Sequence, residues 1–245
     1  MLKVYDTYEL LCEAVTDEIC KAISRNPQML LCIAAGHTSL GVFKSLREAL
    51  KSGKVDFSHA AFVAMDEWMD MSKKTPGSCG AFLYDEFLGH INFAPENIRL
   101  FDGTVSNREA ECDSVEGFIA SHGGSIDYLV LGSGMNGHLA LNEPGTPMDS
   151  RAHVTALDPL TAAVGQKYFR KETTLTGGLT LGINDFAEAK RSVLMVTGSH
   201  KNGILNKILS NTISADIPAT AVRNFKNASI YADRAAVEGI PVKNV

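Results

Sequence analysis

Short apolar runs alternate with helix-like segments along this sequence, and this alternation restricts the folds that it can adopt. Five runs are typical of strands, and they cover residues 29–35, 60–66, 126–131, 192–196 and 228–232. The segments between them show the helical spacing of apolar residues, the first over 8–25. Short, continuous apolar strands are typical of parallel sheets covered on both faces. The sequence therefore predicts an α/β fold, a doubly wound, mostly parallel, Rossmann-like sheet with helices on both faces.

The composition fits one globular domain that binds a small ligand. The 245 residues are 45% hydrophobic and 21% charged, and no linker or internal repeat divides them, so we expect a single domain over 1–245. The net charge of -5 argues against nucleic acid as a partner, so an anionic ligand would need a locally built site. The N-terminus lacks the apolar core of a signal peptide, and no apolar run approaches membrane-spanning length. We expect a cytoplasmic protein without a membrane partner, either monomeric or a homo-oligomer.

The loop after the third expected strand contains glycines, a histidine and a carboxylate. Its spacing Gly132-x-Gly134-x-x-Gly137 formally matches a dinucleotide-binding fingerprint. That fingerprint should open a long helix, whereas Pro144 and the glycine after it follow within eight residues. The glycines could instead shape a simple strand-to-helix turn. Downstream, Asp158 precedes a proline and is better explained as a helix start than as a ribose ligand.

His138 and Glu143 give this loop a chemical interpretation that a turn alone does not explain. Glu143 lies five residues after His138 and could fix the tautomer of the imidazole, which suits a proton shuttle. The pair lacks a third ligand at a known metal-binding spacing, so we expect no metal. The five cysteines form no C-x-x-C pair and are expected to be reduced thiols; they are Cys12, Cys20, Cys32, Cys79 and Cys112.

Two other strand ends carry polar residues. Asp66 and Glu67 follow the apolar residues 61–65 at the end of the second expected strand. Burial there would raise the pKa of a carboxyl group and produce a useful base. Alternatively, Asp66 caps the following segment and Glu67 is solvated, which would explain the two residues equally well. A loop of Gly36, His37 and Thr38 offers amides and hydroxyls to an anion, and Lys201 adds a cation in a similar loop. Simple helix capping is the alternative for both loops.

Read together, these segments resemble the glucosamine-6-phosphate deaminase/isomerase family, whose members carry G-H-x-x-x-N-E-P and an upstream M-D-E. The corresponding residues here are 137–144 and 65–67. The residues at 66–70, 75–79 and 136–139 are more similar to the galactosamine-6-phosphate branch. Asn136 is the most informative position, because the glucosamine enzymes usually carry an aspartate there and an asparagine cannot take up a proton at neutral pH.

The resemblance implies conversion of an amino-sugar 6-phosphate into a ketose 6-phosphate and ammonia without a cofactor. It implies that His138, oriented by Glu143, opens the sugar ring and that Asp66 moves the carbon-2 proton. It places the phosphate against Gly36, His37, Thr38 and Lys201, with either Lys167 or Arg170 as a further cation. The remaining substrate contacts that it implies are Glu67, Gly134, Asn136 and Gly137. The small-molecule partner is thus a sugar phosphate, galactosamine 6-phosphate in preference to glucosamine 6-phosphate.

Two other functions are alternatives. A 6-phosphogluconolactonase has a similar glycine loop and histidine but usually lacks the Asn-Glu-Pro ending found at 142–144. A sugar-phosphate sensor would keep the phosphate loops without chemistry, and the presence of Asp66, His138 and Glu143 argues against it. The stretch 150–155 lacks most of the positive charge that serves allosteric control in hexameric relatives, so we expect no activation by an amino-sugar phosphate.

Overall fold

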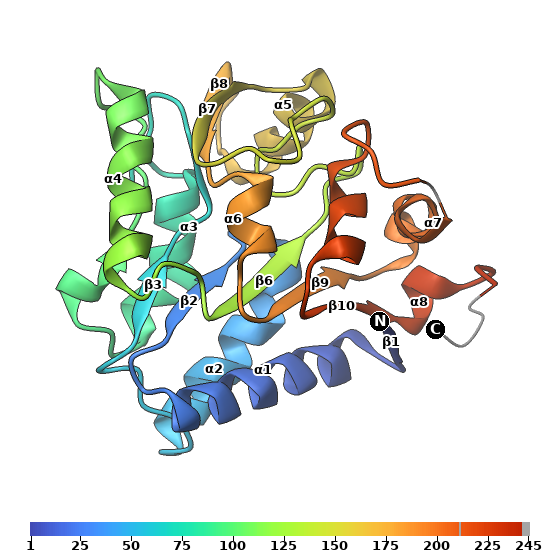
Figure 1. Cartoon of the computed structure of the whole chain (residues 1–245), viewed down its shortest axis with the longest axis horizontal. Helices are drawn as coiled ribbons and strands as arrows, with labels where there is room; N and C mark the ends of the chain where they lie inside the picture. Colours follow the sequence, from blue (N-terminus) through green and yellow to red (C-terminus); the bar gives the residue numbers. More distant parts are fainter. Residues whose placement is uncertain (211, 242–245) are drawn as a thin grey trace.

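A computed structural model describes residues 1–210 and 212–241. A seven-stranded parallel sheet forms its centre, with the strand order β1-β10-β9-β6-β2-β3-β5 (Figure 1). The strands are β1 (Leu2–Tyr5), β2 (Leu30–Ile33), β3 (Ala61–Val63), β5 (Ile98–Arg99), β6 (Tyr128–Gly132), β9 (Ser192–Val196) and β10 (Ala228–Asp233). The predicted doubly wound, mostly parallel sheet is confirmed.

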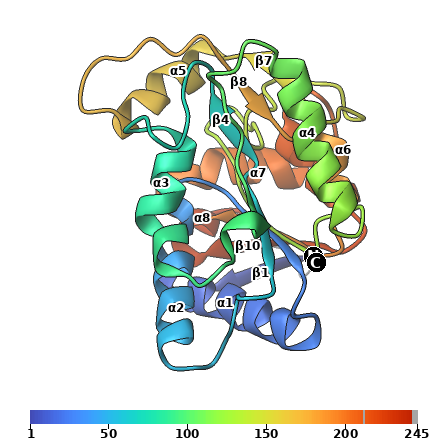
Figure 2. The ribbon, with the colours of Figure 1, turned by 90° about the vertical axis from the view of Figure 1, so that its left-hand side faces the viewer.

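Helices cover both faces of this sheet, and alternate strand residues point to each. Figure 2 shows the two layers on opposite sides of the sheet. One core packs the sheet against α1 (Tyr8–Arg25), α2 (Leu40–Lys51) and α3 (Cys79–Glu86). The other packs it against α4 (Arg108–Ser121), α6 (Ile183–Ala187), α7 (Asn202–Ser210) and α8 (Arg234–Val237). None of the helices in the described part of the chain is long and apolar enough to span a membrane.

Short 3-10 turns complete the main layers. They are η1 (His37–Ser39), η2 (Leu88–His90), η3 (Pro95–Asn97), η5 (Ser199–Lys201) and η6 (Pro218–Asn224). The turn η1 leads directly into α2, and η5 leads directly into α7, so each places polar residues between a strand end and a helix. The predicted change from strand to loop to helix after 29–35 and after 192–196 is confirmed.

A second, antiparallel sheet was not predicted. It consists of β4 (Asp66–Trp68), β8 (Gly177–Thr180) and β7 (His153–Ala156), with β8 in the middle. The expected strand over 60–66 is therefore wrong in its second half, since β3 ends at Val63 and Asp66 begins a strand of the other sheet. Between β7 and β8 the chain forms α5 (Pro159–Gly165) and η4 (Gln166–Tyr168). Figures 1 and 2 show this sheet and α5 together at one end of the molecule.

The chain reverses its direction of progress through the main sheet between β2 and β6. From β2 it proceeds outward through β3 to β5, and from β6 outward through β9 to β10. Loops after the two central strands therefore diverge and leave a crevice at their carboxyl ends, the usual place for a ligand in such sheets. The loops concerned begin at Ala34 and at Ser133.

Candidate active site

A cavity of about 340 Å³ opens at this crevice. Its floor comes from the loops after β2 and β6, and its walls come from β4, from the start of α3, from the α5–η4 segment and from the loop after β9. Segments far apart in the sequence thus meet around one space. Most of the residues predicted to act on or bind a sugar phosphate line it: Gly36, His37, Thr38, Asp66, Gly134, Asn136, His138, Lys167 and Lys201.

Asp66 reaches the cavity because β4 alternates its side chains between two sides. Asp66 and Trp68 line the cavity, whereas Glu67 between them does not. Burial raises the pKa of Asp66 to about 7; a hydrogen bond from the Cys79 thiol opposes this rise, and the neighbouring Glu67 charge adds to it. A carboxyl group with a pKa near neutrality can both accept and return a proton.

Glu67 is buried with 1% exposure, and the structure does not bring it to the cavity as the resemblance implied. Its carboxylate accepts hydrogen bonds from the backbone N–H groups of Trp68 at 2.8 Å, Cys79 at 2.9 Å and Gly80 at 2.8 Å. Burial raises the pKa of Glu67, although these bonds lower it in part. Glu67 therefore ties β4 to the first turn of α3, where Cys79 and Gly80 lie.

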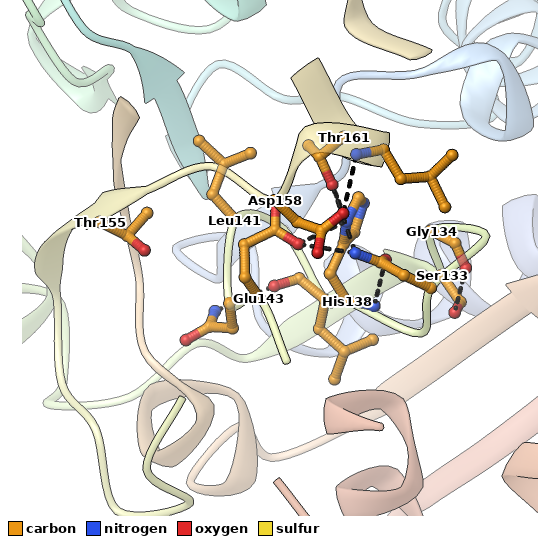
Figure 3. A network of polar contacts seen from close by, with 12 residues as sticks. Ser133, Gly134, His138, Leu141, Glu143, Thr155, Asp158 and Thr161 are labelled. Carbon is orange, nitrogen blue, oxygen red and sulfur yellow. Dashed lines mark hydrogen bonds and ion pairs between the residues drawn. The ribbon is translucent and has the colours of Figure 1, made fainter. Parts of the chain in front are cut away.

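His138 and Glu143 lie together, as predicted, within a wider polar network (Figure 3). The Nδ1 atom of His138 is 3.4 Å from Oε2 of Glu143 and 2.9 Å from Oγ1 of Thr161. The side-chain amide of Asn136 donates to Glu143 Oε2 at 2.9 Å, and its oxygen accepts the backbone N–H of His138 at 3.1 Å. Burial opposes the ionisation of Glu143, but the hydrogen bond and charge of His138, together with the polar side chains of Thr161 and Asn136, outweigh it and lower the pKa of Glu143.

The glycine loop gives His138 its position and does not open a helix. Neither the dinucleotide fingerprint nor a strand-to-helix turn is correct, since the next regular element after β6 is β7. A Cβ atom on Gly134 would lie 2.4 Å from the His138 ring, so only glycine fits beneath the imidazole. Gly137 has φ +90°, and its Cβ would lie 2.6 Å from Ile217. It shapes the loop and does not line the cavity.

The cavity lining also carries positive charge. Lys201 donates to the Ser133 carbonyl at 2.6 Å, and burial together with the charge of Lys167 lowers its pKa to about 8. Burial also lowers the pKa of Lys167. Within the described residues neither lysine forms an ion pair with a carboxylate. Two lysines beside the loop that holds Gly36 and Thr38 form a suitable site for a phosphate.

The structure separates the two alternatives for a further cation. Lys167 lines the cavity, whereas Arg170 lines a different depression on the other side of Tyr168 and Phe82. The centroid of the Tyr168 ring lies 5.3 Å from that of His37 and 5.8 Å from that of Phe82. These three aromatic side chains line the cavity together with the lysines. Within the described residues, no group of three or more His, Cys, Asp or Glu side chains is placed to hold a metal ion.

Thr161, Tyr168 and Cys79 are among the cavity residues that were not predicted to take part in it. Thr161 and Tyr168 come from the segment between β7 and β8, and Cys79 from the start of α3. Cys79 was expected to be an ordinary buried thiol, and it is free and buried like the other four cysteines, but it also contacts Asp66. Asp158 accepts the N–H of Leu160 at 2.8 Å as the cap of α5, which confirms the predicted helix start.

Known proteins are similar to this chain in sequence and in fold. The family described as glucosamine-6-phosphate isomerases/6-phosphogluconolactonase matches residues 5–231. The chain belongs to this family. A glucosamine-6-phosphate deaminase of Thermoanaerobacter sp. (strain X514) is 31% identical over 235 residues, covering 96% of this chain and 92% of the relative.

Two further comparisons bear on the site. AgaI of Escherichia coli (strain K12), which carries the name of a deaminase, is 33% identical over 222 residues, covering 89% of this chain and 86% of its own. The solved structure of a monomeric glucosamine-6-phosphate deaminase superposes with a TM-score of 0.93 at 30% identity, covering 97% of this chain and 98% of that one. The predicted family resemblance is thereby confirmed.

Proposed function

We propose that this protein converts galactosamine 6-phosphate and water into tagatose 6-phosphate and ammonia. The observation that carries the proposal is the lining of one cavity, which contains the carboxyl group of Asp66, the imidazole of His138 and the two lysines Lys167 and Lys201. A base, a proton shuttle and a phosphate site are the three parts that the reaction needs. The names of the relatives support deamination of an amino-sugar phosphate.

The first step is opening of the sugar ring. His138 takes the proton from the anomeric hydroxyl at carbon 1 and delivers it to the ring oxygen, so the carbon–oxygen bond of the ring breaks and an aldehyde forms. Glu143 accepts hydrogen bonds from the polar side chains around His138 and stabilises the imidazolium that forms in between. Asn136 keeps this carboxylate in place through its 2.9 Å hydrogen bond.

The second step is proton transfer between two carbons. Asp66 removes the proton from carbon 2 of the open-chain amino sugar, which gives an enolamine, and returns it to carbon 1, which gives a ketimine at carbon 2. Water adds to the ketimine, ammonia leaves, and the ketone remains. With a pKa of about 7, Asp66 is an effective base and can still release the proton to carbon 1.

The phosphate group anchors the substrate at the basic end of the cavity. Lys201 and Lys167 supply charge, and the loop with Gly36, His37 and Thr38 supplies polar groups beside them. Both lysines are partly desolvated, so a phosphate dianion beside them stabilises their charged forms. Binding energy at this end positions the sugar against Asp66 and His138.

The preference for the galacto epimer is supported by the segments that resemble the galactosamine branch. Trp68, Cys79 and Asn136, one from each of these segments, all line the cavity. They are therefore placed to contact the sugar, where a missing or misplaced hydrogen bond to one hydroxyl changes specificity by orders of magnitude. Glucosamine 6-phosphate is the second candidate substrate, because the relatives most often carry that name.

The test is a comparison of kcat/KM for ammonia release from the two amino-sugar phosphates. We expect galactosamine 6-phosphate to be preferred by at least about tenfold, and we expect Asn136→Asp to reduce this preference. A preference for glucosamine 6-phosphate would leave deamination in place and refute the assigned epimer. Ammonia release from neither sugar would refute the proposed function.

A further inference from the structure

Thr161 makes the shortest side-chain contact to the Nδ1 atom of His138. The distance from Nδ1 to Thr161 Oγ1 is 2.9 Å, compared with 3.4 Å to Glu143 Oε2. Thr161 is 23 residues from His138 in the sequence and has 4% exposure. It lies in the first turn of α5, whose start is fixed by the Asp158 cap and by the proline after it. Figure 3 shows Thr161 meeting His138 and Glu143 from a separate element.

We propose that Thr161 is a positioning residue that holds the neutral His138 ring in its Nδ1–H tautomer and thereby leaves Nε2 free to accept a proton. This inference rests on the proposed function for its catalytic consequence, but the tautomer itself can be measured without any substrate.

The direction of the hydrogen bonds follows from what each group can donate. An ionised carboxylate only accepts, whereas a threonine hydroxyl has one proton to donate and lone pairs to accept. Glu143 Oε2 lies 3.4 Å from His138 Nδ1, so a lone pair on Nδ1 would face a carboxylate that cannot donate a hydrogen to it. A hydrogen on Nδ1 avoids this conflict, and the Thr161 oxygen, which lies 2.9 Å from Nδ1 and 3.5 Å from the Asn136 amide nitrogen, then accepts from both donors.

The tautomer matters for ring opening. With Nδ1 protonated, Nε2 has a free lone pair, and His138 lines the cavity in which the substrate would lie. The other tautomer would present an N–H group to the anomeric hydroxyl and could not take its proton. Since α5 is one wall of the cavity, the wall that encloses the substrate also sets the state of the proton shuttle.

The test combines an isosteric loss of the hydroxyl with its conservative return. Thr161→Val keeps the branched shape and removes the hydroxyl, whereas Thr161→Ser keeps the hydroxyl. Thr173→Val is the matched control, because Thr173 lies in the same β7–β8 connection and its hydroxyl donates to the Lys171 carbonyl outside the cavity. Nitrogen-15 spectra of the histidine rings report the tautomer directly, with the His138 signals assigned by their loss in His138→Asn.

We expect neutral His138 to be protonated at Nδ1 in the wild type, in Thr161→Ser and in Thr173→Val, and to show mixed tautomers in Thr161→Val. For ammonia release we expect kcat to fall by about tenfold or more in Thr161→Val with little change in KM, and to recover in Thr161→Ser. Protonation of Nε2 in the wild type would overturn the inference, even if Thr161→Val failed to fold. An unchanged tautomer and kcat in a folded Thr161→Val would overturn it as well. If the wild type released no ammonia, the proposed function would fail while the spectra still decided the tautomer.

Discussion

Replacing Asp66 by asparagine should stabilise this protein and abolish its activity at the same time. The carboxyl group of Asp66 has a pKa of about 7 in the folded protein because burial and the neighbouring Glu67 disfavour its charge. In the unfolded chain it would ionise near its ordinary value of 3.8. Between pH 3.8 and about pH 7 the folded state binds one more proton than the unfolded state, so the free energy of unfolding falls as pH rises. Asparagine has nearly the same shape and no charge, and it removes this effect.

The size of the effect follows from the two pKa values. Each pH unit between about 4 and 7 reduces the free energy of unfolding by about 1.4 kcal/mol, so the full difference at pH 8 is about 4 kcal/mol. This value is an upper bound, because Asp66 faces the cavity and water there reduces the cost of its charge. At pH 5 the same calculation leaves less than about 2 kcal/mol.

Urea unfolding of the wild type and of Asp66→Asn at pH 5 and pH 8 measures this difference. The variant should be more stable at both pH values, and its advantage should be larger at pH 8 by about 2.5 kcal/mol. Ammonia release should fall by at least about a hundredfold, since the base is lost, while the affinity for the phosphate-bearing ligand stays close to that of the wild type. Equal stability of the two proteins at pH 8, or full activity of the variant, would refute the assignment of Asp66 as a buried base.

Three further predictions concern the other parts of the site. The rate constant kcat should rise about tenfold between pH 6 and pH 8 as Asp66 loses its proton, and KM should rise above about pH 8 as Lys201 loses its charge, both measured by ammonia release across the pH range. Gly134→Ala should lower kcat by at least about tenfold, because the added methyl group displaces the His138 ring; a wild-type rate would contradict the described packing. Velocity should depend hyperbolically on substrate and should not respond to an N-acetylated amino-sugar phosphate, and a sigmoidal curve relieved by that compound would contradict this prediction.

Five strands of the main sheet could be predicted because they are buried on both faces and therefore stand out as continuous apolar runs. The edge strands β1 and β5 are partly exposed and were not predicted. The second sheet could not be predicted, since β4 is only three residues long and contains Asp66 and Glu67, and β8 begins with two glycines. Neither pattern has the length or the β-branched content by which a strand is recognised. Because side chains alternate between the two sides of β4, Asp66 and Glu67 have different roles, although their adjacent positions in the sequence do not distinguish them.

The candidate site was predictable where polar residues directly follow a strand of the main sheet, as at Gly36 and His138. Thr161 and Tyr168 come from a connection between two strands of the second sheet, and nothing in their local sequence indicates that they lie above the carboxyl ends of β2 and β6. The choice between Lys167 and Arg170 likewise depended on which side of Tyr168 each side chain occupies.

The proposed deamination is tested most directly by the stoichiometry of the wild-type reaction with galactosamine 6-phosphate, measured beside a separate assay with 6-phosphogluconolactone. We expect one ammonia and one ketose 6-phosphate for each amino-sugar phosphate consumed, and no hydrolysis of the lactone above its spontaneous rate. Lactone hydrolysis without ammonia release would show that the cavity of Asp66 and His138 serves ester chemistry and would contradict the proposed deamination.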